Sequence, residues 1–80
     1  MRIMLNGEPR EVTSDLSVFS LLQDLELQPD RVAVEVNLNI LDRSQFRSSM
    51  LSEGDRVEII SFIGGGSTSI LHTITLEPHT

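Results

Sequence analysis

The stretch LSEGDRVEIISFIGGG, residues 51–66, decides the fold because it joins a tight turn, a long strand and a glycine run. Glu53-Gly54-Asp55 is typical of a turn. Residues 56–63 are rich in the β-branched and aromatic side chains that favour strands. We therefore expect a strand that leads directly from the core into Gly64-Gly65-Gly66.

Side chains alternate between the two faces of this predicted strand. One face carries Val57, Ile59, Ser61 and Ile63, and the other carries Arg56, Glu58, Ile60 and Phe62. If a helix covers the first face, the second begins charged and becomes apolar toward the glycines. Ile60 and Phe62 then form either an exposed docking patch or part of a core that wraps around the strand end.

The first third of the chain predicts a hairpin and a helix. Arg2 to Leu5 alternates as a strand, and Asn6-Gly7 is a strong hairpin signal before a returning strand through residues 10–12. The helical stripe that follows has spacing i, i+3, i+4 and i+7 and consists of Val18, Leu21, Leu22 and Leu25. We expect Ser17 to be its N-cap and Pro29 to end it.

Two more segments precede the last strand. Residues 32–36 are β-branched and predict a strand with Asn37 as its polar exit, and residues 40–41 predict a short extended piece. Residues 42–52 predict a connection with core anchors at Phe46, Met50 and Leu51. The chain therefore predicts a two-layer α+β domain whose mixed sheet carries the helix on one face. Its first and last strands can then lie side by side in parallel.

Composition excludes several classes of function. The 80 residues carry a formal net charge of -6, which disfavours binding to nucleic acid or to an anionic membrane. There is no cysteine and no lysine, and both histidines, His72 and His79, follow the glycines. The side chains that most often act as nucleophiles or bases are thus missing from residues 1–66. We expect a protein without enzymatic activity of its own, located in the cytoplasm because the charged start MRIMLNGEPR is unlike a signal peptide.

The glycine run has three interpretations. The first is a flexible linker, and the second is a phosphate-binding loop. The third is a chain end that threads into the active site of an ATP-dependent enzyme. The phosphate loop is set aside because no P-loop or dinucleotide-binding frame, lysine or helical pattern accompanies the glycines. Threading suits glycines because they have no Cβ to clash with a narrow channel, and a terminal glycine carboxylate is open to reaction with ATP.

RVAVEVNLNILDRSQF, residues 31–46, together with residues 51–66, resembles the sulfur carrier proteins of thiamin biosynthesis, called ThiS. The resemblance spans residues 1–66, the whole predicted domain. It implies a ubiquitin-like β-grasp fold, with a mixed sheet of four to five strands and one main helix packed across it.

The resemblance also implies a chemistry. Gly66 would carry the acyl-adenylate and then the thiocarboxylate, Gly64 and Gly65 would thread into the partner, and Ile60, Phe62 and Ile63 would dock. The implied partners are a ThiF-like adenylating enzyme that uses ATP, a cysteine desulfurase or sulfurtransferase, and a ThiG-like thiazole synthase. No bound cofactor and no metal is implied.

Three other functions stay open. The small subunit of molybdopterin synthase shares the fold and the Gly-Gly end, although Phe62-Ile63 stands where that family tends to have prolines. A ubiquitin-like protein modifier would share the activation chemistry. An interaction module would use the glycines only as a hinge.

Residues 67–80 extend beyond the glycines at which ThiS-like chains usually end. We expect this extension to be mobile, or to be removed by a processing protease. The alternation of Ile70, His72, Ile74 and Leu76 with Leu71, Thr73 and Thr75 also fits a strand. Such a strand would cover the Ile60 and Phe62 patch or add to a sheet edge. A metal site at His72, His79 and Glu77 is not expected.

Overall fold

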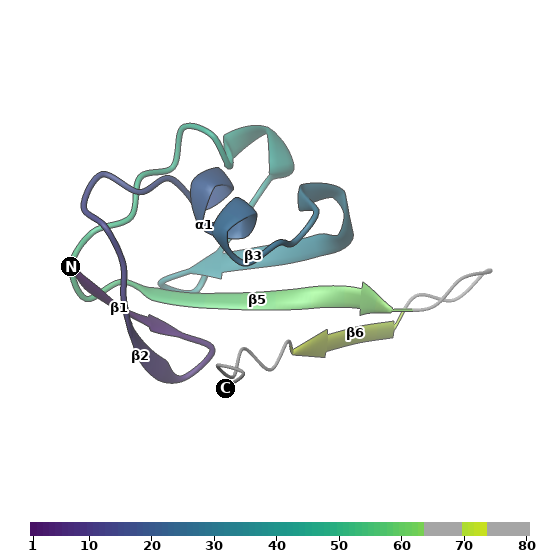
Figure 1. Ribbon diagram of the computed structural model, residues 1–80. Helices are drawn as coiled ribbons and strands as arrows, with labels where there is room; N and C mark the ends of the chain where they lie inside the picture. Colours follow the sequence, from purple (N-terminus) through teal and green to yellow (C-terminus); the bar gives the residue numbers. More distant parts are fainter. Residues whose placement is uncertain (64–69, 74–80) are drawn as a thin grey trace.

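The computed structural model describes residues 1–63 and 70–73, which form a sheet with a helix across one face (Figure 1). The strands are β1 (Arg2–Leu5), β2 (Glu8–Glu11), β3 (Val32–Val36), β4 (Asn39–Leu41), β5 (Arg56–Ile63) and β6 (Ile70–Thr73). The helices are α1 (Val18–Asp24) and the short 3-10 helices η1 (Pro29–Arg31) and η2 (Arg43–Gln45). The predicted two-layer α+β class is confirmed.

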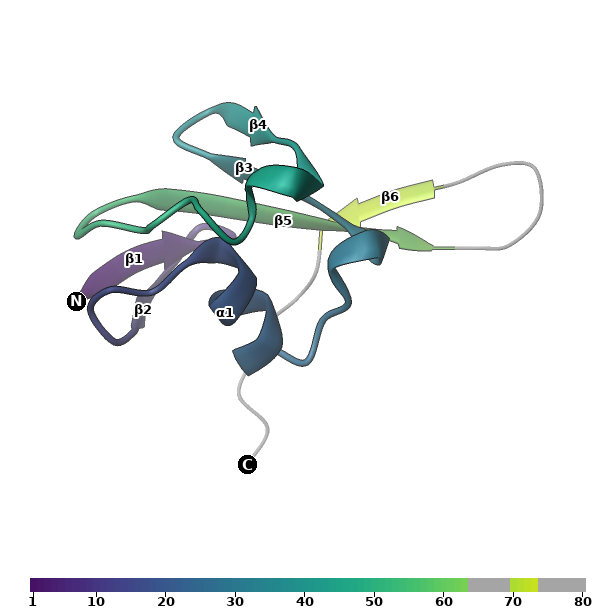
Figure 2. The ribbon, with the colours of Figure 1, turned by 90° about the horizontal axis from the view of Figure 1, so that it is seen from above.

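The sheet has the order β2-β1-β5-β3-β4, and β6 also pairs with β5 (Figure 2). Strands β1 and β5 run parallel, with Met4 opposite Arg56 and Leu5 opposite Val57. The other pairings are antiparallel. The sheet is therefore mixed, and the expected parallel contact between the first strand and β5 is confirmed.

The β1–β2 hairpin turns at Asn6 and Gly7, as predicted. Both residues have positive φ, 50° and 85°, which is the backbone of the tight turns that match strand twist. Strand β2 then spans Glu8–Glu11, so it starts earlier than expected and Val12 lies just beyond it. The N-terminal amino group of Met1 donates to the carbonyl oxygen of Val12 at 2.7 Å and closes the open end of the hairpin.

Helix α1 begins where the sequence predicts, at the Ser17 N-cap. The Ser17 hydroxyl accepts a hydrogen bond from the backbone N–H of Ser20 at 3.0 Å. The N–H groups of Val18 and Phe19 donate to the carbonyls of Ser49 and Phe46, both at 2.9 Å. The connection after η2 thus supplies acceptors that a free helix start would lack.

The end of α1 differs from the prediction, because the helix stops at Asp24 rather than running to Pro29. Glu26 adopts a left-handed backbone with φ 59°. The N–H of Leu27 donates to the Leu22 carbonyl and the N–H of Glu26 donates to the Gln23 carbonyl. These two bonds form a Schellman motif, which ends the helix with a glutamate where glycine is usual. Pro29 instead opens η1.

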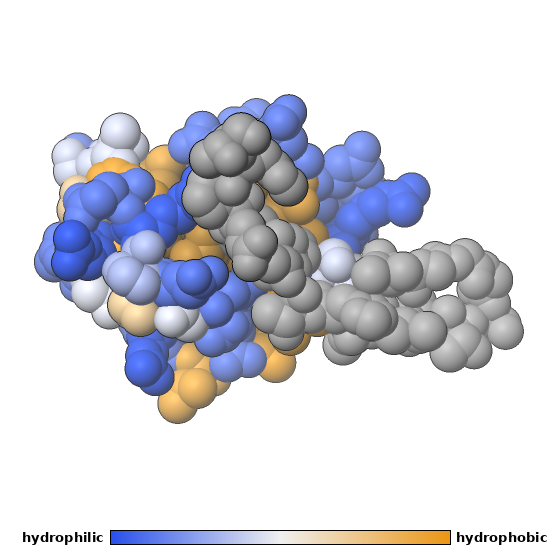
Figure 3. Space-filling model, turned by 60° about the horizontal axis from the view of Figure 1, so that its bottom comes forward, coloured by the Kyte–Doolittle hydropathy of each residue, from blue (hydrophilic) through white to orange (hydrophobic). Residues whose placement is uncertain are grey.

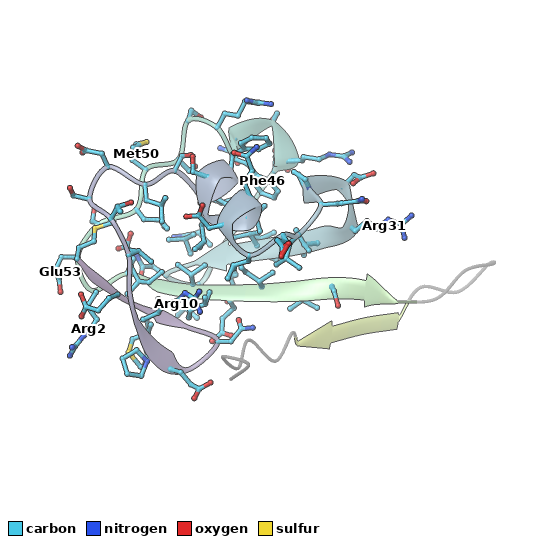
Figure 4. The ribbon with its side chains drawn as sticks, viewed as in Figure 1. Arg2, Arg10, Arg31, Phe46, Met50 and Glu53 are labelled. Atoms are coloured by element: carbon cyan, nitrogen blue, oxygen red, sulfur yellow. The ribbon has the colours of Figure 1, made fainter. Side chains whose placement is uncertain are left out.

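The core lies between α1 and the inner face of the sheet. Its buried side chains are Ile3, Leu5, Leu16, Val18, Leu21, Leu22, Val32, Val34, Phe46, Leu51, Val57 and Ile59. Phe46 and Leu51 are therefore core anchors, as expected. Met50 is not, because its side chain is 53% exposed. Residue 50 forms a β-bridge with Ser17 and its side chain lies on the outside of the molecule (Figure 4), whereas its neighbour Leu51 is buried.

Candidate functional site

The candidate site is the end of β5, because this strand carries the chain from the core toward the glycines. Strand β5 lies between β1 and β3 in the sheet. Val57 and Ile59 have no exposed surface. The buried half of β5 therefore anchors the residues that follow it in the chain.

Asn6 fixes the middle of β5 from the neighbouring hairpin turn. Its side-chain oxygen accepts a hydrogen bond from the Ile59 N–H at 2.7 Å, and its side-chain nitrogen donates to the Ile59 carbonyl at 3.3 Å. Strand β1 ends at Leu5, so no β1 backbone group is in register with Ile59. The asparagine amide replaces the missing backbone partner and extends the sheet contact by two residues.

Asn37 and Asp55 fix the start of β5. The Asn37 side-chain oxygen accepts from the Arg56 N–H at 2.9 Å, and its amide nitrogen donates to Asp55 Oδ1 at 3.0 Å. Asp55 Oδ2 accepts from the Ser52 N–H at 2.8 Å. At the same edge, the Arg2 N–H donates to Glu53 Oε1 at 2.9 Å, and Figure 4 shows these two residues side by side. The turn before β5 is thus tied to two other strands.

The end of β5 extends past its neighbours in the main sheet. On one edge, β3 pairs with β5 as far as Ser61, which lies opposite Val32. Strand β6 pairs antiparallel with the last four residues of β5, from Ile60 opposite Thr73 to Ile63 opposite Ile70. Ser61 pairs with both Val32 and His72, so β6 occupies the edge opposite β3. A strand from the extension therefore adds to a sheet edge, one of the arrangements that its alternation fits.

The predicted docking residues are placed only in part. Ile60 lies on the sheet face away from α1 and is half-buried. Phe62 and Ile63 belong to β5, but their side chains lie outside what the structure describes. Gly64, Gly65 and Gly66 also lie outside the described residues. The docking and threading roles stay predictions.

The described part of the chain offers no constellation for catalysis. No group of three or more His, Cys, Asp or Glu side chains that could hold a metal ion occurs in residues 1–61. Residues 1–66 contain no Cys, His or Lys. No helix in the described ranges is long and apolar enough to cross a membrane. What the site offers is a strand that is fixed in the sheet and leads into the three glycines.

Two features of the site were not predicted. The sequence predicts Asn6 as a turn residue and Asn37 as a strand exit, and the structure shows that their side chains also bond the backbone of β5. The only sequence signal for such bonds is an asparagine next to a strand end, because its side-chain amide can both donate and accept a hydrogen bond.

The exposure of two apolar residues in the β3–β4 hairpin was not predicted either. Leu38 is 85% exposed and Ile40 is 75% exposed.

Comparisons with known proteins agree with this geometry. The model of the ThiS family matches residues 3–66. The crystal structure of the thiamine biosynthesis protein ThiS from Geobacter metallireducens superposes with a TM-score of 0.72 at 38% sequence identity, and covers 82% of this chain and 100% of that one. The sulfur carrier protein ThiS of Escherichia coli is 26% identical over 66 residues, which are 82% of this chain and 100% of that protein.

Longer proteins match the same region. The thiazole synthase of Paramagnetospirillum magneticum is 40% identical over 67 residues, which are 84% of this chain and 21% of the synthase. The thiazole synthase of Magnetococcus marinus is 39% identical over 66 residues, 82% of this chain and 20% of that protein. The chain thus spans about a fifth of the length of these two synthases.

Proposed function

The chain belongs to the ThiS family, and from this premise we propose that it is a sulfur carrier for the thiazole of thiamin, with Gly66 as the residue that carries sulfur. The observation that supports the proposal most is the position of β5. This strand is fixed by Asn6 and Asn37 and leads from a buried core directly into three glycines. A carrier needs such a rigid domain with a narrow chain end.

The proposed chemistry takes place at the carboxylate of Gly66. One carboxylate oxygen attacks the α-phosphate of ATP, pyrophosphate leaves, and an acyl-adenylate forms. A persulfide of a cysteine desulfurase or a sulfurtransferase supplies sulfur to the carbonyl carbon, AMP leaves, and reductive cleavage of the remaining sulfur–sulfur bond by a thiol gives the thiocarboxylate. The thiocarboxylate then gives its sulfur to the thiazole precursor on a thiazole synthase. The carrier needs no base or nucleophile of its own, which suits the absence of Cys, His and Lys from residues 1–66.

A ThiF-like adenylating enzyme and a ThiG-like thiazole synthase are the proposed partners. Two relatives of this chain are thiazole synthases in which the matching segment is about a fifth of the protein. A carrier-like segment and a larger protein therefore share one chain there, as expected for partners that act on each other. Gly64 and Gly65 are proposed to thread, and Ile60, Phe62 and Ile63 to contact the enzyme.

In the 80-residue chain the Gly66 carbonyl is part of the amide bond to Ser67, and an amide cannot be adenylated. We therefore propose that the Gly66–Ser67 bond is hydrolysed by a processing protease before activation. Hydrolysis frees the carboxylate and also detaches β6, which pairs with Ile60–Ile63 in the unprocessed chain.

An exchange assay tests the proposal. With the adenylating enzyme of the same organism, the chain ending at Gly66 is expected to support ATP-dependent exchange of labelled pyrophosphate, because acyl-adenylate formation is reversible. The 80-residue chain and a chain ending in Gly66 carboxamide are expected to give only the background of the enzyme alone. Equal exchange with all three chains would show that the Gly66 carboxylate is not the group activated.

A further inference from the structure

Two carboxylates stand directly opposite each other on the sheet face that α1 does not cover. Glu35 of β3 is the register partner of Glu58 of β5. Their neighbours Val34, Val57 and Ile59 are buried on the α1 side, so both glutamates point to the opposite face. Both are half-buried. Like charges at directly opposed positions of adjacent strands destabilise a sheet.

No ion pair among the described residues involves either of these carboxylates. The ion pair recorded among the described residues joins Arg2 Nε to Glu11 Oε1 at 2.8 Å, near the other edge of the sheet. Neither the Glu35 nor the Glu58 carboxylate has a hydrogen bond or an ion pair within the described part of the chain. Arg56 shares their face two residues before Glu58, but it is exposed and forms an ion pair with neither carboxylate.

Apolar side chains lie beside the two carboxylates on the β4 side and in the row toward the end of β5. Ile40 lies opposite Glu35 on the outer side and is 75% exposed. Ala33 and Ile60 lie opposite each other in the next row of the same face. Leu38 is 85% exposed at the turn of the β3–β4 hairpin and has a left-handed backbone with φ 71°, which is unfavourable for leucine. Figure 3, with the underside of the molecule turned forward, shows apolar side chains interleaved with hydrophilic ones.

We propose that this face, centred on Glu35 and Glu58 and bordered by Ile40, Ala33 and Ile60, docks the adenylating enzyme through one of its arginine or lysine side chains. The cation would lie between the two carboxylates, with apolar side chains of the enzyme on the isoleucines. Such a side chain converts a repulsive pair into two charge-assisted contacts that exist only in the complex. The inference rests on the proposed function and specifies the chemistry of its first partner.

Other occupants fit this face less well. No group of three or more His, Cys, Asp or Glu side chains that could hold a metal ion includes these two carboxylates in residues 1–61. A nucleic acid would be repelled by the glutamates and by the net charge of -6. A second copy of the chain would bring the same two carboxylates against this pair. Charge complementarity therefore favours a basic protein surface.

The test compares binding and stability in the same glutamine variants. Chains ending at Gly66 are prepared as wild type, Glu35→Gln, Glu58→Gln and, as a matched control, Glu8→Gln, which removes an exposed carboxylate from β2. Each variant at position 35 or 58 is expected to bind the adenylating enzyme about tenfold more weakly, because a charge-assisted contact is lost. The same two variants are expected to raise the thermal midpoint by about 2–5 °C, because the repulsion is relieved.

The outcomes separate this inference from the proposed function. A docking role is supported if the variants at positions 35 and 58 bind more weakly at unchanged or raised stability, while Glu8→Gln behaves like the wild type. A purely structural role would not weaken binding in a domain that is more stable. Wild-type affinity in both variants overturns the docking surface and leaves the proposed function standing. If the wild-type chain itself fails to bind the enzyme, the proposed function fails and the inference fails with it.

Discussion

Deletion of Gly66 from the processed chain is expected to abolish sulfur transfer to thiazole. The shortened chain still ends in a glycine carboxylate, at Gly65, but that carboxylate lies one residue, about 3.5 Å, short of its position in the longer chain. A misplacement of about 1 Å lowers the rate of a positioned reaction about 100-fold, so we expect a loss of at least about 1,000-fold in adenylation.

Reconstituted thiazole formation and single-turnover adenylation measure this loss. The thermal midpoint of the shortened chain serves as the control, and we expect it to be unchanged because Gly66 lies outside the core-forming residues 3–59. Gly66→Ala is expected to give a smaller defect, since it keeps the carboxylate in place and adds only one methyl group beside it. Full activity after deletion would show that adenylation does not depend on the number of glycines at the end of the chain.

Phe46→Ala is expected to lower the free energy of unfolding by about 3–4 kcal/mol, which is a large share of the stability of a small domain. Phe46 is 2% exposed and is among the largest fully buried side chains. Its carbonyl also accepts the Phe19 N–H at the start of α1. The truncation leaves a cavity between the helix and the connection that covers its N-terminus, and the thermal midpoint is expected to fall by roughly 20 °C.

Met50→Ala is the matched control for this substitution. Both positions lie in the connection between η2 and β5, but the Met50 side chain is 53% exposed. We expect a change of less than about 0.5 kcal/mol from it, because surface substitutions rarely exceed that value. Urea unfolding followed by circular dichroism measures both variants. Equal destabilisation by the two would contradict the assignment of Phe46 to the core and of Met50 to the surface.

The elements with strong local signals were predictable from the sequence. The stripe Val18, Leu21, Leu22 and Leu25 identified α1, and Asn6-Gly7 identified the first hairpin, because both patterns express the geometry of one element. The alternation through residues 56–63 correctly placed Val57 and Ile59 in the core. The resemblance to ThiS then supplied the arrangement of these elements, which the sheet order and the structural match to ThiS confirm.

Features that depend on contacts between distant segments were not predictable. The end of α1 was expected at Pro29, yet tertiary packing of Leu27 and a left-handed Glu26 end it at Asp24. Met50 was expected in the core, and its bridge with Ser17, far away in the sequence, turns it outward. The opposition of Glu35 and Glu58 depends on the β3–β5 register, which no single segment determines.

The most direct test of sulfur carriage is the intact mass of the untagged protein, recovered from its own host under thiamin limitation. We predict a species that ends at Gly66, with a fraction heavier by the exchange of one oxygen atom for sulfur. That mass difference identifies a thiocarboxylate at the chain end, and it disappears after treatment that hydrolyses thiocarboxylates. A population that ends uniformly at Thr80, with no sulfur-containing form, would contradict sulfur carriage and leave the three glycines as a linker.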